Sequence, residues 1–151
     1  MRFDSNWKRR PFMYPKKERV AAHLSSAINE MRLLLKMSER IETPDDYLTT
    51  LSGMIVYRAC GMSLQYVTES MVKIRSLCGS ELFRHYPTIP WSSVFGMRNF
   101  LSHEYGEVDA EGIFGTVKRD IPILLSVTEQ MLADVNGNKM KHLLENDGSC
   151  G

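Results

Sequence analysis

Apolar residues recur at every third or fourth position along this chain, and this pattern constrains the fold more than any other sequence feature. Between Lys16 and Ile41 the recurring residues are Val20, Leu24, Ile28, Met31 and Leu35. This spacing places side chains on one face of an α-helix, whereas a half-buried strand would alternate at every second residue. No segment shows convincing strand alternation. The sequence therefore predicts an all-α protein.

Turn and capping signals divide the first half of the chain into helices. Thr43 suits a helix N-cap and Pro44 suits the first helical position. From there to about Cys78 the residues are largely compatible with a helix. We expect a short helix that runs into a long one, with a bend near Gly53, and Gly79 is expected to end the long helix.

The second half of the chain predicts further helices. Trp91 begins one that extends to about Tyr105. Asp109 is a candidate N-cap for the next helix, and Pro122 stands in the first turn of another that continues to about Val135. Since the connections are short, the expected fold is an up-and-down bundle of four to five helices.

We expect the bundle to occupy residues 16–135, between a basic, partly disordered arm at 1–15 and a short helix or flexible tail at 136–151. The first 19 residues carry seven basic side chains against two acidic ones, in a chain whose net charge is +1. Such an arm suits contact with nucleic acid or with an acidic protein. The alternative is a solvated leader without a partner.

The composition is that of a soluble globular protein, with 43% hydrophobic and 25% charged residues. The sequence has no run of about 18 apolar residues and no apolar block typical of a secretory signal. We therefore expect a cytoplasmic protein that does not associate with membranes. Cys60, Cys78 and Cys150 are odd in number and widely spaced, which favours free thiols over a disulfide framework or a zinc site. No metal or other cofactor is expected.

Arg98, Asn99, His103 and Tyr105 form the candidate functional site, near the end of a predicted helix. At about 100° per residue, Asn99 and His103 share a helix face, whereas Arg98 lies roughly 140° away from His103. Three arrangements would bring Arg98 and His103 together: the arginine reaches around, the helix unwinds near His103, or a second copy of the chain supplies the missing group. Gly106 favours unwinding.

The spacing of Arg98, His103 and Tyr105, with Asn99 directly after the arginine, resembles the signature of the HepT-like (DUF86) branch of the HEPN superfamily. The flanking residues are also similar to that branch: Ile89-Pro90-Trp91, Gly96-Met97, Val108-Asp109 and Ile121-Pro122. The similarity covers about residues 69–132. It implies a helical bundle that forms a homodimer, with the motif helices of the two chains facing each other.

The same resemblance implies a metal-independent endoribonuclease in which the ribose 2′-hydroxyl attacks the neighbouring phosphate. His103 is suited to proton transfer because an imidazole titrates near neutral pH. The planar donors of Arg98 are suited to the phosphoryl oxygens, and Asn99 could orient the reacting groups. The family keeps an acid in the corresponding long helix, which makes Glu69 a candidate supporting residue.

Acidic residues crowd the end of the motif helix and would repel RNA: Glu104, Glu107, Asp109 and Glu111. An RNA path would therefore need the basic arm or lysines of a second subunit. The acidic cluster could also be read with His103 as a site for a hard cation. Asp109 and Glu111 are already explained, however, by the start of the next helix.

Tyr105 has a second role in the family that this chain resembles. HepT-like toxins are paired with a minimal nucleotidyltransferase antitoxin, which transfers AMP to this tyrosine and silences the toxin. The modification would place a negative phosphate beside Arg98 and block the RNA phosphate. The competing interpretation is a non-catalytic helical dimer that binds a nucleotidyltransferase partner or nucleotides without cutting RNA.

Overall fold

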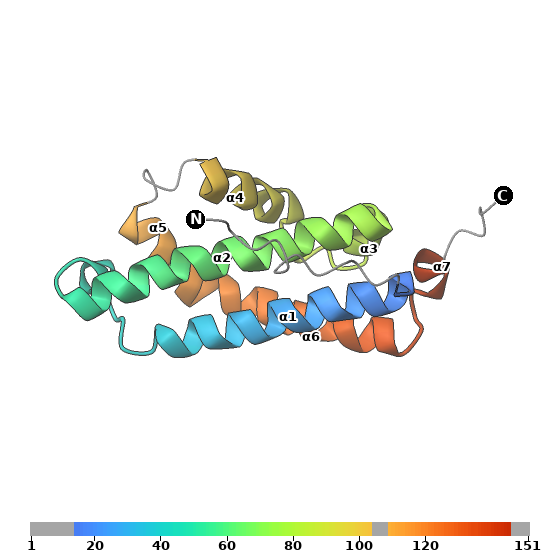
Figure 1. Ribbon diagram of the computed structural model, residues 1–151, viewed down its shortest axis with the longest axis horizontal. Helices are drawn as coiled ribbons and strands as arrows, with labels where there is room; N and C mark the ends of the chain where they lie inside the picture. Colours follow the sequence, from blue (N-terminus) through green and yellow to red (C-terminus); the bar gives the residue numbers. More distant parts are fainter. Residues whose placement is uncertain (1–13, 104–108, 146–151) are drawn as a thin grey trace, which may run out of the picture.

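The computed structural model describes residues 14–103 and 109–145, except for the side chains of residues 102 and 103. All regular secondary structure in these ranges is helical (Figure 1), which confirms the predicted all-α bundle. The long helices are α1 (Lys16–Met37), α2 (Leu51–Cys78), α4 (Trp91–His103) and α6 (Ile121–Asn136). The shorter ones are η2 (Pro44–Tyr47), α3 (Glu81–Arg84), α5 (Ala110–Gly115), η4 (Thr116–Asp120) and α7 (Lys141–Leu144).

Helices α1 and α2 pack along each other and form the centre of the bundle. Helix α1 contacts α2 along one side and α6 along another, while α4 lies across α2 on the side away from α1 (Figure 1). Four of the five apolar residues expected on one face of α1 are buried where these helices meet: Val20, Leu24, Ile28 and Met31. Leu35 is only partly buried, and its neighbour Leu34 is fully inaccessible instead. Among the described residues, no helix combines the length and apolarity needed to cross a bilayer.

The helix boundaries around α2 confirm most of the expected signals. Thr43 is the N-cap of η2, Pro44 is the first residue of that helix, and the Asp46 carboxylate accepts the backbone N–H of Thr43 at 2.9 Å. Gly79 follows the last residue of α2 with a φ of 69°. Glycine adopts this left-handed conformation without steric cost, which explains why α2 ends there.

The expected bend at Gly53 is wrong. Helix α2 runs without interruption from Leu51, and the break between η2 and α2 lies at residues 48–50. Thr50 caps α2 by accepting the Gly53 N–H at 2.9 Å. A Cβ at Gly53 would lie 1.9 Å from the carbonyl oxygen of Asp46. Glycine at this position therefore allows η2 to pack closely against α2 and does not mark a bend.

The helices on both sides of Pro122 form one continuous helical run, whereas the sequence predicted separate helices. Asp109 is the N-cap of α5, as predicted, and accepts the Gly112 N–H. Between α5 and α6 the backbone adopts the wider π-helical form over Thr116–Asp120. Pro122 lacks an N–H, and its ring collides with the carbonyl group four residues earlier, so a local widening before it keeps the helix intact.

The connection between α3 and α4 is held by Tyr86. Its side chain is buried, and its hydroxyl donates to Asp134 Oδ2 on α6 at 2.6 Å. Its carbonyl oxygen accepts the indole N–H of Trp91 at 2.9 Å. Tyr86 therefore fixes the first turn of α4 relative to α6.

Replacing Tyr86 by phenylalanine is expected to lower the free energy of unfolding at pH 7 by about 1–2 kcal/mol, because the buried hydrogen bond to Asp134 is lost. That bond is the main reason why the pKa of Asp134 is lowered. A carboxyl with a lowered folded-state pKa stabilises above its unfolded pKa of about 3.9, and this contribution disappears as the pH falls through the folded-state pKa.

The effect of Tyr86→Phe should therefore be smaller at pH 3 than at pH 7, as measured by urea unfolding at both values. Tyr66→Phe is the control, since Tyr66 is 49% exposed and its hydroxyl should contribute little. An equal loss for Tyr86→Phe at both pH values would show that the hydroxyl acts through packing instead.

Candidate active site

The crossing of α4 over α2 brings together three of the predicted site residues. Arg98 on α4 donates from Nε to Oε2 of Glu69 on α2 at 2.6 Å. Arg98 Nη1 also donates to the side-chain oxygen of Asn99 at 3.0 Å. Glu69, suggested only by the family resemblance, is thus the direct partner of the arginine although 29 positions separate the two residues.

The Glu69–Arg98 pair lies at the protein surface, where an anionic ligand could reach it. The side chains are 33% exposed for Arg98 and 34% exposed for Glu69. The hydrogen bond and the negative charge of Glu69 raise the pKa of Arg98, so the guanidinium stays protonated. A guanidinium has five N–H groups, and these two hydrogen bonds engage two of them. The others have the fork geometry that suits a phosphate group.

His103 is the last residue of α4, and the backbone remains helical through it. The helix therefore does not unwind before His103. This excludes unwinding ahead of His103 as the way in which Arg98 and His103 meet. The His103 side chain and all of Tyr105 and Gly106 lie outside the described residues. Their roles remain predictions.

The first half of α4 is anchored by aromatic packing. The ring of Phe83 lies 4.7 Å from that of Trp91 and 5.2 Å from that of Phe95, measured between centroids, with edge-to-face geometry in both cases. Arg75 of α2 places its guanidinium carbon 4.0 Å from the centroid of Phe95. Arg75 had no predicted role because its partner lies on another helix and no local spacing links the two residues.

The second half of α4 packs only partly against the core. Leu101 is buried, whereas Phe100 is 41% exposed. Cys60 and Cys78 are free thiols, as predicted, and burial raises the pKa of both. Within residues 14–103 and 109–145, no cluster of His, Cys, Asp or Glu side chains has the makeup of a metal site.

Comparison with known proteins identifies the family of this chain. The family model described as ribonuclease HepT-like matches residues 27–131, which include Glu69, Arg98 and His103. This chain belongs to the HepT-like ribonuclease family. The resemblance inferred from the HepT-like motif is therefore confirmed. No solved structure matches the chain significantly.

The curated relatives of this HepT-like chain include archaeal proteins from Methanocaldococcus jannaschii. One, named "Putative RNase MJ1216", is 25% identical over 123 residues, which cover 82% of this chain and 94% of the relative. Another, named "Putative RNase MJ0125", is 28% identical over 90 residues, which cover 60% of this chain and 74% of the relative.

Proposed function

We propose that this HepT-like protein is a metal-independent endoribonuclease and the toxin of a toxin–antitoxin pair. The observation that carries the proposal is the surface cluster in which Glu69 of α2 contacts Arg98 of α4 and Arg98 contacts Asn99. Arg98 and Asn99 lie on the same helix as His103. The names of the relatives support RNA as the substrate.

In the proposed reaction, the ribose 2′-oxygen attacks the adjacent phosphorus and the bond to the 5′-oxygen of the next nucleotide breaks. His103 accepts the 2′-hydroxyl proton or protonates the departing 5′-oxygen. Arg98 donates to the non-bridging oxygens, whose negative charge increases in the transition state. Glu69 holds the Nε edge of the guanidinium and so orients its remaining N–H groups, and Asn99 fixes a second edge.

The test is cleavage of RNA by the purified protein in the presence of a chelator. The expected products carry a 2′,3′-cyclic phosphate on one side and a 5′-hydroxyl on the other. An otherwise identical substrate with a single 2′-deoxyribose at the cleaved position should remain intact, because the nucleophile is missing. Cleavage that needs added Mg²⁺ would contradict the proposed mechanism. A stoichiometric complex with a nucleotidyltransferase, without any cleavage, would favour the non-catalytic dimer.

A homodimer is part of the proposal, and an exposed apolar stripe on α2 supports it. Leu51, Ile55, Met62 and Tyr66 are 72%, 59%, 75% and 49% exposed. At about 100° per residue, these side chains fall within roughly 60° of one another on the helix surface, and Glu69 shares their face. Exposed apolar side chains gathered on one helix face commonly mark interfaces. A second copy packed here would bring its own motif helix toward Arg98.

Tyr105 is the proposed site of AMP transfer by a minimal nucleotidyltransferase. Incubation with such a partner and ATP is expected to add one AMP to the protein and to lower RNA cleavage by at least about tenfold, because the added phosphate competes for Arg98. Mass spectrometry and the cleavage assay measure the two effects.

Tyr105→Phe should accept no AMP and keep its cleavage activity in the presence of the partner and ATP. Tyr14→Phe is the matched control, since Tyr14 is 57% exposed and its variant should still be modified. AMP on the Tyr105→Phe protein would place the modification elsewhere and would contradict this part of the proposal.

A further inference from the structure

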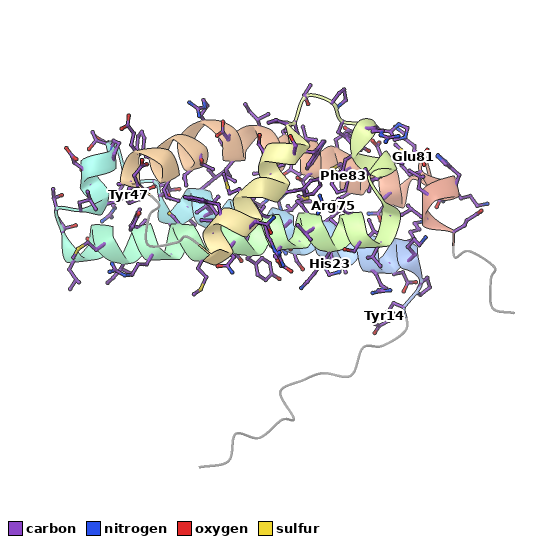
Figure 2. All side chains as sticks on the ribbon, turned by 90° about the horizontal axis from the view of Figure 1, so that it is seen from above. Tyr14, His23, Tyr47, Arg75, Glu81 and Phe83 are labelled. Carbon is purple, nitrogen blue, oxygen red and sulfur yellow. The ribbon has the colours of Figure 1, made fainter. Side chains whose placement is uncertain are left out.

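An open groove of about 620 Å³ lies between the C-terminal part of α2, α3 and the first half of α4. Its walls include Arg75, Arg84, Trp91, Phe95, Gly96 and Asn99. Figure 2 shows Arg75 and Phe83 close together beside the start of α4. The described residues that line the groove include two arginines and no carboxylate, so the groove favours an anionic ligand.

The groove combines guanidinium groups with aromatic rings. Trp91 and Phe95 are half-buried, and their rings are stacked with centroids 6.4 Å apart. Arg75 lies over the face of Phe95, and Arg84 is exposed at the rim. Single-stranded nucleic acids bind to surfaces of this kind, because bases stack on aromatic rings while arginines contact the phosphates. An acidic peptide would use the arginines but would leave the aromatic surface unexplained.

The groove is connected to the candidate active site through Asn99. This residue lines the groove, and its side-chain oxygen accepts the hydrogen bond from Arg98 Nη1 at 3.0 Å. The far end of α4 is followed by the exposed carboxylates of Asp109 and Glu111. A polyanion that approaches Arg98 from the groove therefore meets arginines, whereas one that approaches from the other end meets negative charge.

Gly96 lines the groove and has open space beside it. It lies inside α4, where glycine is less stable than alanine. A Cβ built at Gly96 meets no heavy atom within 4 Å. Close packing within the chain therefore does not account for a glycine here, and a larger side chain would project into free space beside the groove.

We propose that this groove binds single-stranded RNA, with phosphates on Arg75 and Arg84 and a base against Trp91 and Phe95. The strand then continues past Asn99, so that its next phosphate lies at Arg98. The inference deepens the proposed ribonuclease function by assigning the substrate path, but binding in the groove can be measured without any cleavage.

The test uses an RNA of about ten nucleotides in which every 2′-hydroxyl is methylated, so that it binds but offers no nucleophile. The chain has two tryptophans, Trp7 and Trp91, and a Trp7→Phe background leaves Trp91 as the only one. Addition of the oligonucleotide is expected to quench Trp91 fluorescence. Fluorescence anisotropy of the labelled oligonucleotide gives its affinity at several salt concentrations.

Arg84→Ala is expected to weaken binding about tenfold at low salt and to reduce the slope of log K against log salt by about 0.7, the value for one phosphate contact on a single strand. Arg40→Ala is the matched control, because it removes the same charge from an exposed arginine in the turn after α1. Gly96→Glu should weaken binding at least as much as Arg84→Ala. Gly96→Ala should retain binding. That result would show that replacing the glycine in α4 does not weaken RNA binding unless the new side chain reaches the groove.

Equal effects of Arg84→Ala and Arg40→Ala, or no quenching of Trp91, would overturn the groove assignment. Poly-glutamate that binds as tightly as the RNA, with the same quenching, would overturn RNA as the occupant. Failure of the nuclease proposal has a different signature, since the methylated RNA would still bind in the groove while unmodified RNA would remain uncut. Cleavage that is insensitive to Gly96→Glu and Arg84→Ala would instead reject the groove alone.

Discussion

Arg98→Ala is expected to lower RNA cleavage in chelator at least about 100-fold, because the guanidinium is the group proposed to stabilise the developing phosphoryl charge. His103→Ala is expected to lower cleavage about 10²- to 10⁴-fold through the loss of general acid–base catalysis. Both effects should appear in kcat, measured with saturating RNA. Arg98→Lys keeps the charge but loses the planar fork, so its loss should be intermediate.

The chain provides matched controls for these variants. Arg32 donates from Nη2 to Glu129 Oε1 at 2.9 Å, and the two residues lie on different helices, as Arg98 and Glu69 do. Arg32→Ala therefore removes a comparable ion pair that joins α1 and α6 and does not involve α2 or α4, and it should cleave normally. His142→Ala serves the same purpose for His103. Cleavage by Arg98→Ala and His103→Ala at the level of the unaltered protein would remove both residues from the mechanism.

Glu69 is proposed as a positioning residue, and its effect should differ from that of Arg98. Glu69→Gln retains an oxygen that can accept the Arg98 Nε–H but removes the negative charge. Glu69→Gln is expected to lower kcat less than Arg98→Ala does. Glu69→Ala should lower kcat more than Glu69→Gln, because the guanidinium is then free to rotate. This order would not follow from a merely structural role, for which all three variants would change stability and leave kcat of the folded fraction intact.

The fold was largely predictable because helix periodicity and capping are local properties of the sequence. The spacing of Val20, Leu24 and Met31 indicates the buried face of α1, and Gly79 indicates the end of α2, where its φ is positive. Gly53 was misread because its role depends on the carbonyl group of Asp46 in another element. The effect of Pro122 was also misread, since a π-helical segment can absorb the missing hydrogen bond.

The candidate site was predictable where the motif is contiguous and not where it depends on packing. Arg98 and Asn99 are neighbours in the sequence, and the family resemblance identified them together. The bond between Arg98 and Glu69 requires that α4 cross α2, which periodicity does not specify. The contact of Arg75 with Phe95 also requires that α4 cross α2. Neither the groove nor its basic and aromatic lining has a local sequence signal.

Met62→Glu is expected to convert the proposed dimer into a monomer and to lower RNA cleavage about 100-fold or more. Met62 is 75% exposed, so the substitution should leave the core intact while it introduces a carboxylate into an apolar interface. Burial of such a charge without a partner strongly disfavours association. Leu33→Glu is the control, because Leu33 is 49% exposed on α1 and lies outside the α2 stripe. Light scattering gives the oligomeric state of both variants.

The effect of Met62→Glu on cleavage depends on whether Arg98 and His103 act within one chain or across two. If they act across the dimer, a mixed dimer of Arg98→Ala and His103→Ala chains contains one intact site, formed by the arginine of one chain and the histidine of the other. Random mixing of the two variants should then restore roughly a quarter of the activity. Met62→Glu in both chains should abolish the restoration. A monomeric Met62→Glu protein that cleaves normally would show that each chain holds a complete site, so that the Arg98 side chain reaches His103 within its own subunit.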